Sequence, residues 1–149
     1  MTAPTHVYET YIRTTPEKLW DAITNPDLTE RYFHRTRIDS DWTKGSAVAY
    51  RRADGSTAVE GEVLEVDRPR RLSYTWRTLY DEAASRERPS RVTWEIEVLG
   101  DVCKLTLVHD DFDAGSKTYA NVSQGWNAIV CNLKTLVETG EPLPYPEGL

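Results

Sequence analysis

His109, Asp110 and Asp111 form a cluster whose side-chain types suit proton transfer. His109 shares strand parity with Leu105 and Leu107, so its imidazole is expected to face the interior. An imidazole with a pKa of about 6.5 exchanges protons readily near neutral pH. A buried histidine held by a hydrogen bond is the commoner arrangement, and we favour it. The two aspartates are expected to serve the turn and the entrance of the following helix.

Aromatic side chains are a second set with possible binding chemistry. On the predicted elements, Tyr74, Trp76 and Trp94 would face Trp126. Rigid rings can line an apolar pocket, with tyrosine hydroxyls and indole N–H groups as polar handles, or they can fill a core completely. Each ring by itself favours core packing, which is also the role expected of Trp20. The residues alone leave both interpretations open.

Other patterns for catalysis or cofactor binding are not found in the sequence. Two pairs of glutamates share a strand face at a spacing of two, Glu60 with Glu62 and Glu95 with Glu97. A solvated strand face explains such pairs. His6 and His34 complete no metal-ligand spacing with His109. Because nucleophile elbows, phosphate-binding glycine loops and dinucleotide fingerprints are also missing, we expect neither a metal nor an organic cofactor.

The composition describes an acidic globular chain of 149 residues, in which Lys and Arg total 18 and Asp and Glu total 24, for a net charge of −6. With 39% hydrophobic residues and five Trp, the chain can bury one full core. We expect a single domain over 1–149, with an ordered core at about 6–140. The charge disfavours binding to nucleic acid or to an anionic membrane, since both require concentrated cations.

Apolar segments and cysteines indicate the compartment. The longest aliphatic stretch, Ala128–Cys131, is too short for a signal-peptide core or a membrane span. Cys103 and Cys131 lack CxxC spacing, so both are expected to be reduced, small packing residues. These features predict a cytoplasmic protein.

One strand and two helices are expected at the start of the chain. Alternation over Tyr8–Ile12 predicts a half-buried strand. The Thr-Pro pair at 15–16 marks a helix start, because threonine can cap free amides and proline suits the first turn. This helix is expected to end near 25–26. Asp27 is expected to cap a second short helix that runs through Phe33.

About six strands are expected between Thr36 and His109. Turn dipeptides separate several of them, namely Asp54-Gly55, Arg68-Pro69 and Gly100-Asp101. Apolar and polar residues alternate on three of these strands, which predicts an antiparallel sheet with one buried face. The residues expected on that face are Leu72, Tyr74 and Trp76; Val92, Trp94, Ile96 and Val98; and Cys103, Leu105, Leu107 and His109. Gly61 interrupts an earlier strand and is expected to mark a bulge.

The clearest helix lies near the C-terminal end. Apolar residues recur every three or four positions from Tyr119 to Val137, a stripe that must pack on another apolar surface. Gly140 is expected to end this helix, whereas the segment 123–125 either kinks it or separates a lead-in turn. One such helix can lie in the hollow of a twisted antiparallel sheet, with the two short helices closing one end.

The charged connection over 78–90 is expected to be a solvated, mobile loop. The alternative is a flap over a cavity mouth, with Leu79 and Tyr80 against the opening. We favour the loop.

Five segments resemble the START/Bet v-type helix-grip superfamily (SRPBCC), and within it the proteins similar to the C-terminal domain of the activator of the heat-shock protein 90 ATPase. They are TPEKLWDAIT at 15–24, SDWTKGS at 40–46, GEVLEVDRPRRLSYTW at 61–76, LTLVHDDF at 105–112 and GWNAIVCNLKTLVETG at 125–140. The set spans nearly the whole chain in the family's order. The resemblance implies an α+β helix-grip fold, in which a curved antiparallel sheet of about six or seven strands wraps around a long C-terminal helix. Two short helices follow the first strand.

The resemblance also implies an elongated internal cavity, and it favours the cavity interpretation of the aromatic set. The residues expected to line it are Phe33, Trp42, Tyr50, Tyr74, Trp76, Trp94, His109, Val122, Trp126 and Ile129. We therefore expect a cytosolic protein that binds a hydrophobic small molecule, a lipid or a polyketide-like aromatic, in this cavity.

Two other functions stay open, because superfamily relatives include lipid carriers, aromatases, cyclases and co-chaperones. One is a cofactor-independent enzyme of the aromatase, cyclase or hydrolase type, with His109 and Tyr74 as proton-transfer groups. The other is a co-chaperone-like interaction module that stimulates a heat-shock-protein ATPase. Both a monomer and a homodimer are compatible with the acidic charge and an exposed sheet edge.

Overall fold

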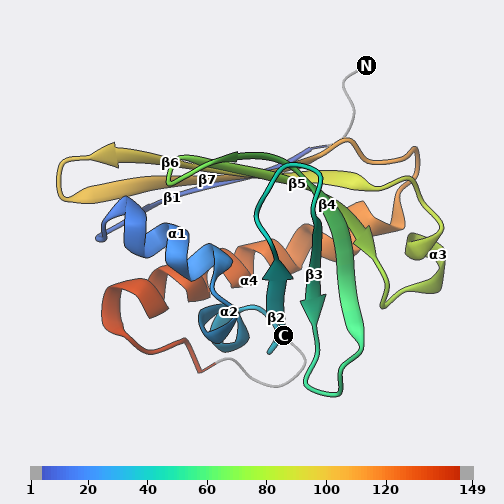
Figure 1. The fold of residues 1–149 in the computed structure, drawn as a ribbon, viewed down its shortest axis with the longest axis horizontal. Helices are drawn as coiled ribbons and strands as arrows, with labels where there is room; N and C mark the ends of the chain where they lie inside the picture. Colours follow the sequence, from blue (N-terminus) through green and yellow to red (C-terminus); the bar gives the residue numbers. More distant parts are fainter. Residues whose placement is uncertain (1–4, 145–149) are drawn as a thin grey trace.

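The computed structural model describes residues 5–144. Seven strands form one antiparallel sheet in the order β1-β7-β6-β5-β4-β3-β2 (Figure 1). Their bounds are β1 (His6–Ile12), β2 (Arg37–Ser40), β3 (Ala47–Arg51), β4 (Thr57–Asp67), β5 (Arg71–Thr78), β6 (Ser90–Leu99) and β7 (Val102–Asp110). The helices of the described residues are α1 (Pro16–Thr24), α2 (Pro26–Tyr32), α3 (Glu82–Ser85) and α4 (Lys117–Thr139).

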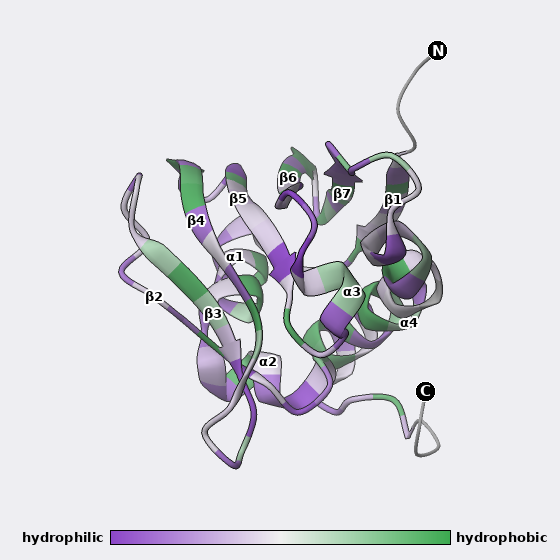
Figure 2. Cartoon of the chain, turned by 90° about the vertical axis from the view of Figure 1, so that its right-hand side faces the viewer, coloured by the Kyte–Doolittle hydropathy of each residue, from purple (hydrophilic) through white to green (hydrophobic). Residues whose placement is uncertain are grey.

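The sheet curves around the long helix α4. Figure 2 shows the strands in an arc from β2 to β1, with the helices beneath them. Helix α4 runs along the hollow side, and α1 and α2 lie together at one end of it (Figure 1). This arrangement confirms the predicted helix-grip architecture, including the two short helices after the first strand.

Short capping motifs place α1 and α2. The Thr15 hydroxyl accepts a hydrogen bond from the Lys18 amide at 3.3 Å, and Pro16 occupies the first turn, as the sequence predicts. The cap of α2 differs from the prediction. Asn25, rather than Asp27, is the N-cap, and its Oδ1 accepts from the Asp27 amide at 2.9 Å. Because Pro26 takes the first helical position, the residue before it must be the cap, and α2 ends at Tyr32.

Helix α4 is continuous through 123–125, so no lead-in turn separates this segment from the helix. Ser116 caps its start by accepting from the Tyr119 amide at 3.0 Å, and Gly140 ends it in the left-handed conformation at φ 86°. The predicted apolar stripe is buried or half-buried along its length. This helix therefore presents one continuous apolar face to the sheet.

The predicted inward faces of β5, β6 and β7 are confirmed, with one exception. Val98 is 55% exposed, because the β6–β7 hairpin extends beyond the helices that cover the sheet. The prediction for Gly61 also needs correction. The register shift lies between Val63 and Glu65, whereas a Cβ on Gly61 would collide with the backbone carbonyl of Thr75. Glycine at 61 therefore permits a close backbone approach rather than a bulge.

The two cysteines are both free and differ in environment. Cys103 is buried on β7, as predicted, whereas Cys131 is exposed on α4 and is not a packing residue. Within residues 5–144, no helix has the length and apolar character to cross a membrane.

Candidate functional site

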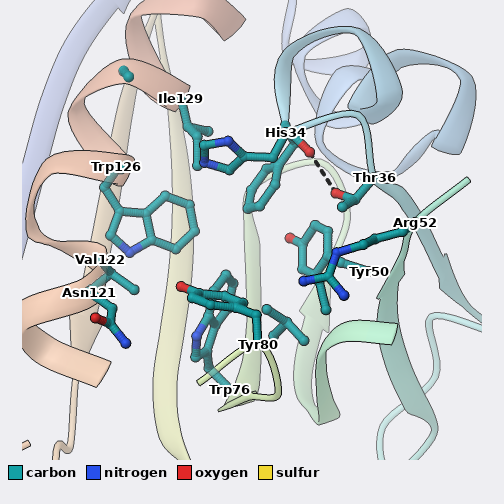
Figure 3. A pocket seen from close by; sticks show the side chains of 15 residues that line it. His34, Thr36, Tyr50, Arg52, Trp76, Tyr80, Asn121, Val122, Trp126 and Ile129 are labelled. Carbon is teal, nitrogen blue, oxygen red and sulfur yellow. Dashed lines mark hydrogen bonds between the residues drawn. The ribbon is translucent and has the colours of Figure 1, made fainter. Parts of the chain in front are cut away.

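A pocket of about 480 Å³ opens between α4, the α2–β2 connection and strands β3, β4 and β5 (Figure 3). Volumes of this order hold small organic ligands in proteins. The lining residues are Phe33, His34, Thr36, Tyr50, Arg52, Ala58, Val59, Trp76, Tyr80, Asn121, Val122, Gly125, Trp126, Ala128 and Ile129.

The pocket lies between α4 and strands β3 and β4, beside the contact that Trp126 of α4 makes with Trp76 of β5. Val122, Trp126 and Ile129 share one helix face and form one wall. Gly125 lies on the same side, and the nearest atom to a Cβ placed there would be Nε2 of His34, at 4.0 Å. The missing side chain at position 125 therefore keeps space open between α4 and the α2–β2 connection.

Aromatic rings make the buried floor of the pocket. The Phe33 ring stacks on Tyr50 with their centroids 4.4 Å apart, and it meets Trp126 edge to face at 5.6 Å. Trp76 contacts Trp126 with a centroid separation of 5.2 Å. Interlocked rings of this kind hold their positions without a ligand, because each is fixed by neighbours on its other side.

The rim of the pocket is polar and exposed. It contains His34, Arg52, Tyr80 and Asn121, whose side chains surround the opening in Figure 3. His34 has a left-handed backbone at φ 49°, and partial burial lowers the pKa of its imidazole, which is therefore neutral at pH 7. The Asn121 amide donates to Asp81 Oδ2 at 3.0 Å. The site thus combines an apolar floor with a few polar groups at its mouth.

The connection over 78–90 includes a short helix and hydrogen bonds to α4, whereas the favoured prediction is a solvated, mobile loop. It contains α3, which Asp81 caps, and Glu87 accepts from the Ser116 hydroxyl and the Lys117 amide, both at 2.7 Å. Tyr80 is 49% exposed and lines the pocket. The alternative interpretation places Leu79 and Tyr80 against the opening; Tyr80 lines the pocket, and Leu79 does not.

His109 lies behind the pocket wall and does not line it. It is fully buried, with 0% of its surface exposed. Trp126 Nε1 donates to His109 Nδ1 at 2.9 Å, which places the ring proton on Nε2, where it is donated to Ser90 Oγ at 2.7 Å. Burial lowers the pKa of His109 to about 3, so the imidazole is neutral. Both ring nitrogens of His109 are hydrogen-bonded within the core, and its pKa lies far below the value of about 6.5 that would suit proton transfer near neutral pH.

Tyr74 and Trp94 are likewise enclosed. Trp94 Nε1 donates to the Tyr74 hydroxyl at 3.0 Å, and that hydroxyl lies 2.5 Å from the hydroxyl of Tyr50. Burial raises the pKa of Tyr74 to about 12, which keeps the phenol protonated. Of these three residues only Tyr50 lines the pocket.

The structure brings most of the predicted lining residues together and separates four. Those that line the pocket are Phe33, Tyr50, Trp76, Val122, Trp126 and Ile129. Tyr74, Trp94 and His109 form the hydrogen-bonded layer behind it. Trp42 lies in the β2–β3 connection with φ 55°, and it packs half-buried against the core away from the pocket. Alternation along strands does not predict the direction of a side chain in a turn, so the prediction that Trp42 lines the cavity was wrong.

Sequence reasoning missed the polar rim. The sequence pattern suggests only a metal-ligand test for His34, and it assigns no role to Arg52 or Asn121. Gly125 was the available signal, because a glycine within an apolar helical stripe marks a missing contact.

The remaining acidic candidates bind arginines on the surface. Asp110 accepts two hydrogen bonds from Arg91, at 2.9 and 2.7 Å, and Asp111 pairs with Arg88 at 2.8 Å. Neither caps α4, contrary to the role expected at its entrance. Glu95 and Glu97 are exposed, as predicted. Among the described residues, no cluster of three His, Cys, Asp or Glu side chains is arranged to hold a metal ion.

Residues 13–138 match the family described as Activator of Hsp90 ATPase homolog 1-like protein. The chain belongs to this family. The match confirms the resemblance seen in the five sequence segments and places the chain among the Bet v-like helix-grip proteins. No curated protein matches the chain in sequence.

Several solved structures share the fold of this AHSA1-like chain. Protein MLL2253 from Mesorhizobium loti is 28% identical with a TM-score of 0.75, over 90% of this chain and 96% of that one. CalU16 from Micromonospora echinospora is 22% identical with a TM-score of 0.75, over 95% and 78%. PFC0360w from Plasmodium falciparum, described as an HSP90 activator, is 21% identical with a TM-score of 0.72, over 93% and 97%. The identities are low, so these similarities support the fold.

Proposed function

We propose that this AHSA1-like protein binds a hydrophobic small molecule, a lipid or a polyketide-like aromatic, in the pocket beside α4. The observation that carries the proposal is a pocket of about 480 Å³ whose floor is made of buried aromatic rings. Phe33, Trp76 and Trp126 border this space, and an apolar ligand that enters it gains free energy by leaving water and by contacting the rings. The polar rim would then orient the ligand.

The proposal is tested with N-phenyl-1-naphthylamine, an uncharged probe that fluoresces in apolar surroundings. We expect saturable binding to the unmodified protein. Gly125→Leu places a branched side chain in the pocket, at a helix position where leucine is favoured over glycine, so the variant should fold. Binding should weaken at least tenfold, because the added atoms occupy the ligand's space.

Asn127→Leu is the matched control, since it adds the same side chain two residues along α4 on an exposed position. It should bind the probe as the unmodified protein does. Absence of saturable binding to the unmodified protein, or equal binding to the Gly125→Leu variant, would rule out this pocket as the site. Circular dichroism of both variants checks that they are folded.

Acid–base catalysis through His109 and Tyr74 is not part of the proposal. Both side chains lie outside the pocket lining, and each has its hydrogen bonds within the core. At neutral pH the imidazole of His109 carries one ring proton, on Nε2, and that proton is already donated to Ser90 Oγ.

Contact with a heat-shock-protein chaperone is a second candidate function. It is supported by the family to which the chain belongs and by the fold shared with a protein described as an HSP90 activator. The test measures ATP hydrolysis by the host's chaperone with and without the purified protein. A rate increase that saturates with added protein supports this function, and an unchanged rate at saturating protein contradicts it.

The cytoplasm is the compartment that we propose for either function. Cys103 and Cys131 are free thiols, the state that a reducing compartment maintains.

A further inference from the structure

The pocket differs in charge from the rest of the molecule. The chain has a net charge of −6, yet its pocket lining includes Arg52 and no aspartate or glutamate. Within this lining Arg52 is the charged side chain, and the carboxylates of Asp54 and Asp81 lie beside the rim rather than in the lining. Apolar surface on the floor and positive charge at the mouth select different parts of one ligand.

Arg52 is available to pair with a ligand. Within the described residues its guanidinium forms no salt bridge, and Nη1 donates to Ser56 Oγ at 3.3 Å. The neighbouring Arg51 is different, because it pairs with Asp39 at 3.3 Å and donates to Thr57 Oγ1 at 3.2 Å. The nearby carboxylate of Asp54 is engaged by the amide and hydroxyl of Ser56, at 2.8 and 2.6 Å. The Asp54 carboxylate interacts electrostatically with Arg52 without forming a salt bridge, so the guanidinium can still pair with an anion in the pocket.

His34 adds a neutral hydrogen-bonding group to the same rim. Its ring makes no hydrogen bond with the described part of the chain, and Nε2 faces the space beside Gly125. The left-handed backbone at both His34 and Arg35, at φ 49° and 57°, projects this imidazole over the opening. Non-glycine residues adopt this conformation at an energetic cost, which is often found at binding sites.

We propose that the pocket selects an amphipathic acid: a small molecule with an apolar, ring-containing or aliphatic body and one anionic group. The body lies against Phe33, Trp76 and Trp126, and the anionic group binds the Arg52 guanidinium with the imidazole of His34 beside it. This inference rests on the proposed function and adds the charge of the ligand to it.

The experiment compares two probes that share one aromatic body. N-phenyl-1-naphthylamine is uncharged, and 8-anilinonaphthalene-1-sulfonate carries a sulfonate on the same skeleton. Their dissociation constants are measured by fluorescence for the unmodified protein and for Arg52→Gln. Removal of the guanidinium should weaken sulfonate binding about fivefold, the range of a partly exposed ion pair, and leave the uncharged probe unchanged within twofold.

Two further variants separate a specific contact from a general loss of charge. Arg51→Gln removes the same charge one residue away, at a side chain outside the pocket lining, and should change neither probe's affinity. Arg52→Lys should retain part of the preference for the sulfonate. Added salt should weaken sulfonate binding to the unmodified protein more than to the Arg52→Gln variant, because only the former makes the ion pair.

The outcomes distinguish this inference from the function beneath it. Binding of the uncharged probe with no effect of Arg52→Gln on the sulfonate overturns the acid-selective inference and leaves the pocket as a binding site. Equal weakening of both probes by Arg52→Gln also overturns it, since a lost charge cannot act on an uncharged molecule. Failure of both probes to bind the unmodified protein contradicts the proposed function itself.

Discussion

The two ends of the space beneath the sheet use similar residues in different ways. At the closed end, under β5, β6 and β7, His109, Tyr74 and Trp94 have their polar atoms in hydrogen bonds within the core. At the pocket end, His34 and Arg52 line an opening, and neither forms a salt bridge within residues 5–144. Residue type therefore does not separate packing from binding; the difference is whether each polar atom has a partner inside the protein.

Trp126 belongs to both regions and joins them. Its indole N–H holds His109 in the closed end, while its ring forms part of the pocket floor. Because the hydrogen bond sets the ring's orientation from behind, the floor is rigid before any ligand arrives. A preorganised apolar surface of this kind loses little conformational entropy on binding.

Truncating an apolar side chain of α4 to alanine should give the largest difference in unfolding free energy between the packed core and the pocket wall. Leu133→Ala, at a side chain with 0% exposure outside the pocket lining, should cost about 3 kcal/mol of unfolding free energy, because it leaves an enclosed cavity. Ile129→Ala, on the pocket wall, should cost less, about 2 kcal/mol, since some of the removed atoms border space that is already open. Urea unfolding measures both. Equal costs would mean that the pocket is filled in solution.

Acid should destabilise the closed end through His109. Burial lowers the pKa of His109 to about 3, whereas the pKa of an imidazole in the unfolded chain is about 6.5. Below about pH 6.5 the unfolded state therefore binds more protons than the folded state. The contribution of neutral His109 to the unfolding free energy is fully present above about pH 6.5 and is lost as the pH falls towards about 3. Between pH 7 and 5 the loss should be about 2 kcal/mol, measured by urea unfolding at each pH.

His109→Gln is the comparison for this pH dependence. The variant should be less stable at pH 7 but should lose less stability between pH 7 and 5. His34, whose pKa burial also lowers, contributes with the same sign, so His34→Gln should retain most of the unmodified slope. A slope in His109→Gln identical to that of the unmodified protein would contradict a neutral, buried His109.

Removing a single tyrosine hydroxyl should also cost more stability in the buried core than at the pocket rim, with smaller changes in unfolding free energy. Tyr74→Phe should cost about 1 to 2 kcal/mol, because the Trp94 indole N–H and the Tyr50 hydroxyl both lose a buried partner. Tyr80→Phe, at the exposed rim, should change stability by less than about 0.5 kcal/mol. Thermal unfolding of the two variants measures the difference. A cost for Tyr80→Phe as large as that for Tyr74→Phe would place the rim within the structural core.

The fold was predictable because the spacing of apolar residues along the chain indicates which elements form and which of their faces are buried. Alternation on β5 to β7 and the stripe on α4 gave the buried faces, including the inward direction of His109. What periodicity does not give is the depth of a buried residue. His109 and Tyr50 both face inward, but only Tyr50 reaches the pocket, and that depends on how far α4 stands from each strand.

The rim was not predictable for a different reason. His34, Arg52 and Tyr80 lie in connections rather than in periodic elements, and the chain brings them together only in three dimensions. The left-handed conformation of His34 has no sequence signal of the kind that a glycine provides. Gly125 was the exception, since its place in an apolar stripe indicates an absent contact from sequence alone.

The most direct measurement follows the indole N–H signals of the five tryptophans by NMR while N-phenyl-1-naphthylamine is added to saturation. Each signal is assigned with a Trp→Phe variant. Trp76 and Trp126, on the pocket floor, should shift most, while Trp20 in α1 and Trp42 in the β2–β3 connection should shift least. Largest shifts at Trp20 or Trp42, or no shift at any of the five at saturation, would contradict ligand binding beside α4.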